Sequence, residues 1–170
     1  MMRRTRAAEA AKAFVETLEG LGLPEDTPDF SDPAALGRRA ALLVVSEAIW
    51  GKYLGPLLET EDVQTLLRVN SRQAVSDLAK RGRLLALNAS GGRKVYPAFQ
   101  FARGGRPFPE MAEVLKTFSG AVETPYTIAS WMVSPEPLLD DKTPAAWMQE
   151  GGNPEPLFEA ARRMAWRLGQ

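Results

Sequence analysis

Apolar residues recur at helical spacing near the start of the chain. Between residues 3 and 19 they follow a period near 3.6 and the run stops at Gly20, which predicts one amphipathic helix. From residue 34 to 54 two apolar stripes cover much of a second helix. Such breadth is typical of a central core helix, but it also fits a helix with one stripe in a homodimer interface, and the pattern leaves both open.

Two short helices joined by a tight turn are predicted between residues 60 and 81. The first, residues 60–67, has Thr60 as its N-cap candidate and two acids in the first turn, where the helix dipole favours negative charge. After a turn at 68–70, Ser71 stands where it can cap a second helix with a regular inward-facing apolar side. This pattern predicts a helix-turn-helix.

An alternating pattern typical of a β-hairpin follows. Gly82 ends the second helix, residues 84–87 and 93–97 are the predicted strands, and 88–92 form the tip. A hairpin in this place is a wing. Its neighbours Tyr96, Phe99 and Phe101 could stack on single-stranded bases, but aromatic side chains after a hairpin more often pack a sheet against helices, so we expect core positions.

In the last third of the chain, capping residues followed by proline predict the starts of helices. These pairs are Thr124-Pro125, Thr143-Pro144 and Asn153-Pro154. The predicted helices run over about 110–119, 125–133, 144–150 and 154–168. The fold class expected is therefore mainly α: a helical bundle with a central winged helix-turn-helix, which contains one small β-hairpin, and a C-terminal helical module.

Three domains are expected from these elements. Residues 1–57 are expected to form an N-terminal helical pair with dimerisation as a candidate role. Residues 58–106 are expected to form a winged helix-turn-helix, and residues 107–170 a C-terminal helical module.

Charge is concentrated in the predicted helix-turn-helix and wing. Between Arg68 and Arg106 nine Lys or Arg residues stand against one acid, Asp77, which gives a local charge of 9 − 1 = +8. The whole chain balances 21 basic against 21 acidic residues, so the remainder carries −8. A compact basic segment is the electrostatic footprint of a surface that meets phosphates, most often those of nucleic acid.

The exposed side of the second helix carries the residue types that read DNA. Arg72, Ser76 and Lys80 lie at i, i+4 and i+8, with Gln73 beside them, and such a row suits the major groove. A solvated helix face and an ordinary soluble hairpin are the plain alternatives. The predicted DNA-binding residues are Ser71, Arg72, Gln73, Ser76 and Lys80 in the helix, and Arg93 and Lys94 in the wing.

Composition argues against catalysis. The chain has no Cys and no His, so disulfides, thiolate chemistry, the usual general base and the commonest metal ligand are missing. Acids do gather between Glu25 and Asp32 and at Asp140-Asp141, but they read as solvated turns rather than a carboxylate dyad or cation site. Gly91-Gly92-Arg93-Lys94 lacks the P-loop pattern. We predict no catalytic residue, no metal and no cofactor.

The chain is expected to be cytoplasmic and away from membranes. Its longest apolar run, residues 40–45, is far short of the roughly 20 residues needed to span a bilayer. Charged residues also interrupt what would be the apolar part of a signal peptide near the N-terminus.

Two groups of segments resemble known families. Residues 60–67, 71–75, 81–87 and 96–101 resemble the excisionase and MerR-like winged helix-turn-helix group. Residues 129–132, 138–148 and Gly151 are similar to the toxin-binding domain of Xre/MbcA/ParS-type antitoxins, whose usual partner is a RES-domain toxin. The chain departs from many members of that family, which carry a Cro-like helix-turn-helix and lack the extra N-terminal helices.

The resemblance implies an antitoxin that neutralises a RES-domain toxin and represses its own operon as a homodimer on double-stranded DNA. The residues assigned to partner binding are Trp131, Trp147, Met148, Arg162, Arg163 and Trp166. Trp and Met of this kind are usually core, although they also suit a protein-binding face. The rivals are a stand-alone excisionase-like or MerR-like regulator or architectural protein, and a hydrolase or transferase that uses carboxylates.

Overall fold

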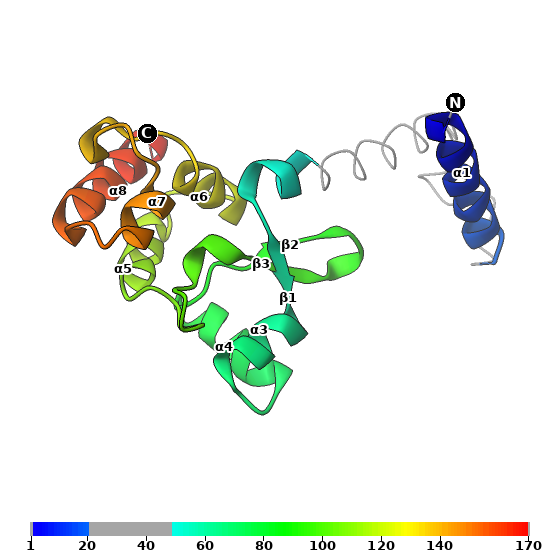
Figure 1. Ribbon diagram of the computed structural model, residues 1–170, viewed down its shortest axis with the longest axis horizontal. Helices are drawn as coiled ribbons and strands as arrows, with labels where there is room; N and C mark the ends of the chain where they lie inside the picture. Colours follow the sequence, from blue (N-terminus) through cyan, green and yellow to red (C-terminus); the bar gives the residue numbers. More distant parts are fainter. Residues whose placement is uncertain (1, 21–48, 170) are drawn as a thin grey trace. The chain divides into compact units, whose positions relative to one another are not determined.

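The computed structural model describes residues 2–20 and 49–169 (Figure 1). The chain divides into two compact units, residues 1–44 and 45–170. In the first unit α1 (Met2–Gly20) matches the helix predicted over 3–19, and its described side chains are exposed. Residues 49–54 are helical. Most of the predicted second helix, with its two apolar stripes, lies outside the described residues.

The helix-turn-helix has the predicted bounds. Helix α3 spans Thr60–Leu67 and α4 spans Arg72–Lys80. Ser71 caps α4 as predicted, because its Oγ accepts a hydrogen bond from the Ala74 N–H at 3.1 Å. Between the helices, Arg68 takes the left-handed conformation with φ 55° and ends α3.

The predicted N-cap of α3 is wrong by one residue. Glu59, not Thr60, holds that position in a capping box with Asp62. The backbone N–H of Glu59 donates to Asp62 Oδ2 at 2.9 Å, and the Glu59 side chain accepts from the Asp62 N–H. Glu is an uncommon N-cap residue, so the Thr before two acids was the more obvious candidate.

The wing belongs to a sheet of three strands rather than to a hairpin alone. Strands β2 (Leu87–Asn88) and β3 (Lys94–Pro97) form the expected antiparallel pair, with a 3-10 turn η2 (Ser90–Gly92) at the tip. Strand β1 (Leu57–Glu59) was not predicted; it pairs with the other edge of β3, so the order is β1-β3-β2. Three residues are too few to show a period of two.

Two hydrophobic cores lie on either side of β3. The smaller holds Val63, Val75, Leu84 and Tyr96 and joins α3, α4 and the sheet. The larger includes Leu85, Leu87, Val95 and Phe99 from the sheet region together with residues of the C-terminal helices. Tyr96 and Phe99 are therefore buried and Phe101 is half-buried, in line with the expected core positions.

The C-terminal helices are the four that the sequence predicts, within one residue at each end. They are α5 (Glu110–Phe118), α6 (Pro125–Met132), α7 (Pro144–Gln149) and α8 (Pro154–Leu168). Thr124, Thr143 and Asn153 cap the last three through their side-chain oxygens. A short 3-10 turn, η4 (Pro137–Leu139), precedes α7. None of the helices in the described ranges is long and apolar enough to cross a membrane.

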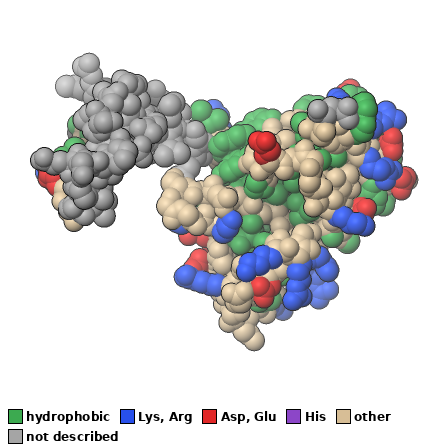
Figure 2. Space-filling view, turned by 180° about the vertical axis from the view of Figure 1, so that it is seen from behind, with side chains coloured by type: hydrophobic (Ala, Val, Ile, Leu, Met, Phe, Trp, Pro, Cys, Tyr) green, Lys and Arg blue, Asp and Glu red, His purple; other side chains and the backbone are tan. Residues whose placement is uncertain are grey.

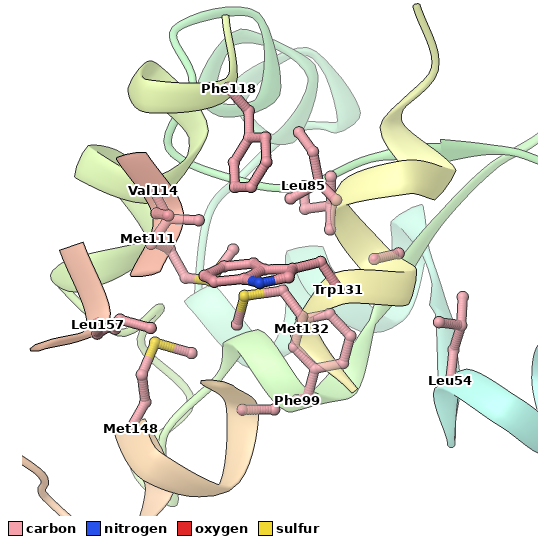
Figure 3. Close-up of a cluster of buried hydrophobic side chains, with 14 of the residues drawn as sticks. Leu54, Leu85, Phe99, Met111, Val114, Phe118, Trp131, Met132, Met148 and Leu157 are labelled. Carbon is pink, nitrogen blue, oxygen red and sulfur yellow. The ribbon is translucent and has the colours of Figure 1, made fainter. Parts of the chain in front are cut away.

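Trp131 lies at the centre of the larger core, with Phe118 and Met132 close to its ring (Figure 3). The Trp131 and Phe118 ring centroids are 5.2 Å apart. Because this core takes residues from both the sheet and the C-terminal helices, the predicted border at 106/107 does not separate two cores. The borders at 57/58 and 106/107 both fall inside the second compact unit.

The buried side chain of Gln100 connects the end of β3 to the backbone of Leu85, which precedes β2. Gln100 is fully buried; its Oε1 accepts from the Leu85 N–H at 2.8 Å. Its Nε2 donates to the carbonyl oxygens of Leu85 and Pro97, both at 3.0 Å. The side chain thus satisfies three backbone groups that would otherwise lose their partners inside the protein.

We predict that Gln100→Met, which keeps the side-chain length but removes these hydrogen bonds, lowers the free energy of unfolding by about 3 kcal/mol, since unsatisfied buried polar groups are costly. Urea denaturation followed by circular dichroism measures the change. Gln149→Met, at the exposed end of α7, is the matched control and should change stability by less than about 0.5 kcal/mol. Equal losses in both variants would contradict the role assigned to Gln100.

Candidate nucleic-acid interface

Helix α4 presents its polar side to solvent and its apolar side to the smaller core. Ser71, Arg72, Gln73 and Lys80 are exposed, Ser76 is half-buried, and Val75 is fully buried beneath them. Lys and Arg side chains gather in the lower half of the surface in Figure 2, in the region of the helix-turn-helix. The predicted recognition residues therefore share one accessible surface.

Two of these residues contact acidic side chains. Arg72 forms an ion pair with Glu61 of α3, and the two side chains are 74% and 51% exposed. Gln73 donates from Nε2 to Asp77 Oδ1 at 2.7 Å, one turn along α4. Sequence reasoning placed Arg72 and Gln73 on the outer face, but it did not pair them with these two carboxylates.

The cations of the wing are also held in place. Arg93 Nη1 lies 2.7 Å from Glu59 Oε1, which joins the wing to the residue that caps α3. Lys94 donates from Nζ to Asn88 Oδ1 on the neighbouring strand. The wing and the start of α3 are thereby fixed to each other through Glu59.

The fold brings α4 and the wing to one hollow. A groove of about 370 Å³ is lined by Ser76, Lys80, Lys94 and Tyr96 among others. A second hollow of about 460 Å³ shares Lys80 and adds Arg81 and Lys116. Lys116 lies on α5, outside the basic segment of the sequence, so only the tertiary structure could bring it to this side.

The acids weighed in the sequence as a catalytic or cation site lie partly in an exposed turn and partly outside the described residues. Asp140 and Asp141 are exposed and take left-handed conformations, with φ 55° and 58°, in the turn after η4. The acids between Glu25 and Asp32 lie outside the described residues. Within residues 2–20 and 49–169, no three His, Cys, Asp or Glu side chains gather where they could hold a metal ion.

Three residues assigned to partner binding are wholly or partly inside the C-terminal module. Trp131 and Met148 are only 5% and 4% exposed, so they can support a binding surface but not touch a partner. The Trp131 indole donates to the buried Glu136 carboxylate at 3.2 Å. Trp147 is half-buried, and its indole donates to the Asn153 carbonyl at 2.8 Å, which braces the turn between α7 and α8.

The other three partner-binding candidates surround a groove of about 720 Å³. Trp166 is 68% exposed and lines it together with Arg162, Arg163 and Arg167 of α8, and with Pro137 and Leu138 of η4. Glu159 pairs with Arg162 at 3.1 Å and Arg163 at 2.8 Å. Hydrogen bonds from Arg163 and Arg162 lower the pKa of the Glu159 carboxyl below its usual value. The arginines are therefore held along the groove.

Comparisons with known proteins assign this chain to no family. No family model matches it, and no curated protein is similar to it at a significant level. Among solved structures, the NMR structure of Rv2175c is similar with a TM-score of 0.49 and 21% sequence identity. The similarity covers 67% of this chain and 79% of that chain.

Proposed function

We propose that this chain binds double-stranded DNA through α4 and the wing, and that it acts as a transcriptional repressor. The observation that carries the proposal is the exposed face of α4, where Arg72, Gln73 and Lys80 stand on a helix-turn-helix next to a wing. In such folds the second helix enters the major groove. The local charge of +8 between residues 68 and 106 supplies attraction to phosphates.

The residue types at this surface suggest that some side chains contact bases and others contact phosphates. Arg72 and Gln73 have side chains that can form paired hydrogen bonds with base edges. Lys80 of α4 and Lys94 of the wing line one groove, whose wall is completed by residues of α5 and α6. Lysine typically holds backbone phosphates as a point charge. Ser71, Ser76 and Arg93 complete the proposed contact surface.

We further propose that the chain is an antitoxin that represses its own operon and neutralises a RES-domain toxin through the C-terminal module. A specific observation favours a protein partner there: Trp166 is 68% exposed in a groove with three arginines. Exposed Trp and Arg are the residues most enriched at energetic centres of protein interfaces. The toxin itself is suggested by the resemblance of residues 129–132 and 138–148 to antitoxin domains.

The alternative is a stand-alone DNA-binding regulator or architectural protein of the excisionase or MerR-like kind. It shares the surface on α4 and the wing and lacks only the toxin. Co-expression with the protein encoded by the adjacent gene separates the two: a stable complex that restores growth supports the antitoxin, whereas a harmless neighbour that does not associate supports the regulator.

We predict that Lys80→Ala and Lys94→Ala each weaken DNA binding and reduce the slope of log K against log salt concentration by about 0.9, because each removes one phosphate contact. Fluorescence anisotropy with a labelled duplex at several NaCl concentrations measures both effects. Lys142→Ala, which removes an exposed lysine paired with Glu150 in the C-terminal module, is the control and should leave the slope unchanged. An unchanged slope in all three variants would sink the assignment of Lys80 and Lys94.

We predict that Trp166→Ala weakens binding of the toxin encoded by the adjacent gene by about 30-fold or more, as expected for loss of an interface hot spot of about 2 kcal/mol. Isothermal titration calorimetry with the purified pair gives the affinity. The same variant should keep its DNA affinity, and Arg72→Ala should show the opposite pattern. Full toxin affinity in Trp166→Ala would remove this groove from the interface.

A further inference from the structure

Two carboxylates support the side chains proposed to read bases. Glu61 on α3 pairs with Arg72, and Asp77 on α4 accepts from Gln73 at 2.7 Å. Asp77 is also the single acid among the nine basic residues between Arg68 and Arg106. Both acids therefore lie where negative charge opposes attraction to DNA, and each contacts a different recognition residue.

We propose that Glu61 and Asp77 are positioning residues that set the sequence specificity of DNA binding by orienting Arg72 and Gln73. This inference rests on the proposed DNA binding. It adds that specificity depends on Glu61 and Asp77, which contact the base-reading residues, as well as on those residues themselves.

The argument for Glu61 concerns the freedom of Arg72. A long side chain that is 74% exposed samples many rotamers, and ordering it on DNA costs free energy. The guanidinium has five N–H donors in a planar fork, so a carboxylate can occupy one edge while another edge remains for the O6 and N7 acceptors of guanine. Glu61 reaches Arg72 from the neighbouring helix and thus fixes its direction before DNA arrives.

The argument for Asp77 concerns which end of the Gln73 amide faces outward. A carboxylate only accepts hydrogen bonds, so the Gln73 nitrogen must turn toward Asp77. The carbonyl oxygen and the second N–H of the amide are then left to pair with the N6 and N7 atoms of adenine. Asp77 therefore favours adenine over guanine, whose O6 would face the Gln73 oxygen.

The negative charge of both acids serves specificity in a second way. A carboxylate near the phosphates lowers affinity for every sequence alike, while a well-positioned base contact raises affinity for one sequence. If the two acids only stabilised the helices, their removal would change stability slightly and would leave base preference unchanged, because exposed pairs of this kind add little to stability. Base preference is therefore the decisive quantity to measure.

The experiment begins with a duplex selected by the wild-type protein from a random pool. Dissociation constants are then measured for this duplex, for its single-base variants and for a random-sequence duplex. Base preference at a position is the ratio of the dissociation constants for the single-base variant and the selected duplex. We expect Glu61→Ala and Asp77→Ala each to lower this ratio at one base pair by about 5-fold, which is part of the discrimination that a bidentate base contact provides. Affinity for random DNA should rise by about 2-fold to 5-fold as a negative charge is lost.

Conservative variants test the accept-only carboxylate at position 77. Asp77→Asn removes the charge and offers Gln73 a donor as well as an acceptor, so it should bind random DNA more tightly and lose part of the base preference. Asp77→Glu keeps the charge and a group that only accepts, so it should retain both the base preference and the wild-type affinity for random DNA. Preference should also be unaffected by Glu61→Ala when Arg72 is already Ala, and by Asp77→Ala when Gln73 is already Ala. Glu150→Ala is the matched control, because Glu150 is 55% exposed and ion-paired, much like Glu61, but lies on the C-terminal module.

The outcomes distinguish this inference from the function on which it rests. If the wild-type protein enriches no sequence and binds no duplex, the proposed DNA binding fails. If the wild-type protein is selective and both alanine variants keep its base preferences, DNA binding stands and the positioning role is overturned. A loss of preference that persists in the Arg72→Ala and Gln73→Ala backgrounds also overturns it, because the carboxylates would then act by another route.

Discussion

Strand β3 is the element on which the second compact unit depends. Successive side chains of a strand point to opposite faces, and here Val95 enters the larger core while Tyr96 enters the smaller one. The same strand pairs with β1 on one edge and β2 on the other. Gln100 adds a polar connection just beyond it, through the backbone of Leu85 and Pro97. Four residues of strand thus join the helix-turn-helix to the C-terminal helices.

This arrangement has a consequence for the two proposed binding surfaces. A regulator built from domains on a flexible linker could bind DNA and a protein partner independently. In this chain the wing contributes Leu87 and Val95 to the core that also holds Trp131 and Met148. A partner bound at the groove of α8 and η4 would therefore act on a module that shares its interior with the wing. Any coupling between toxin and DNA would have a continuous packed path.

Local sequence signals predicted α4, α6, α7 and α8 well because each begins at its own capping residue. Ser71 and the three cap-proline pairs satisfy backbone groups within a few residues, so their meaning does not depend on the rest of the fold. Features that depend on distant partners were missed: strand β1, the merging of sheet and helices into one core, and the buried Gln100. The exposure of Arg72, Gln73 and Lys80 was likewise predictable from the helical period, but the ion pairs of Glu59 and Glu61 arise only from tertiary contacts.

The basic segment also shows why net charge alone describes a binding surface poorly. Its +8 would attract any polyanion, yet Arg72 and Arg93 each pair with a carboxylate from the β1–α3 corner. Exposed pairs of this kind contribute little to folding stability. On the proposed DNA-binding surface, such pairs would exchange strong, undirected attraction for weaker attraction with defined side-chain geometry. Since sequence discrimination requires geometry and general affinity requires only charge, the acids at this corner fit the proposal of a surface that reads DNA better than one that only adheres to it.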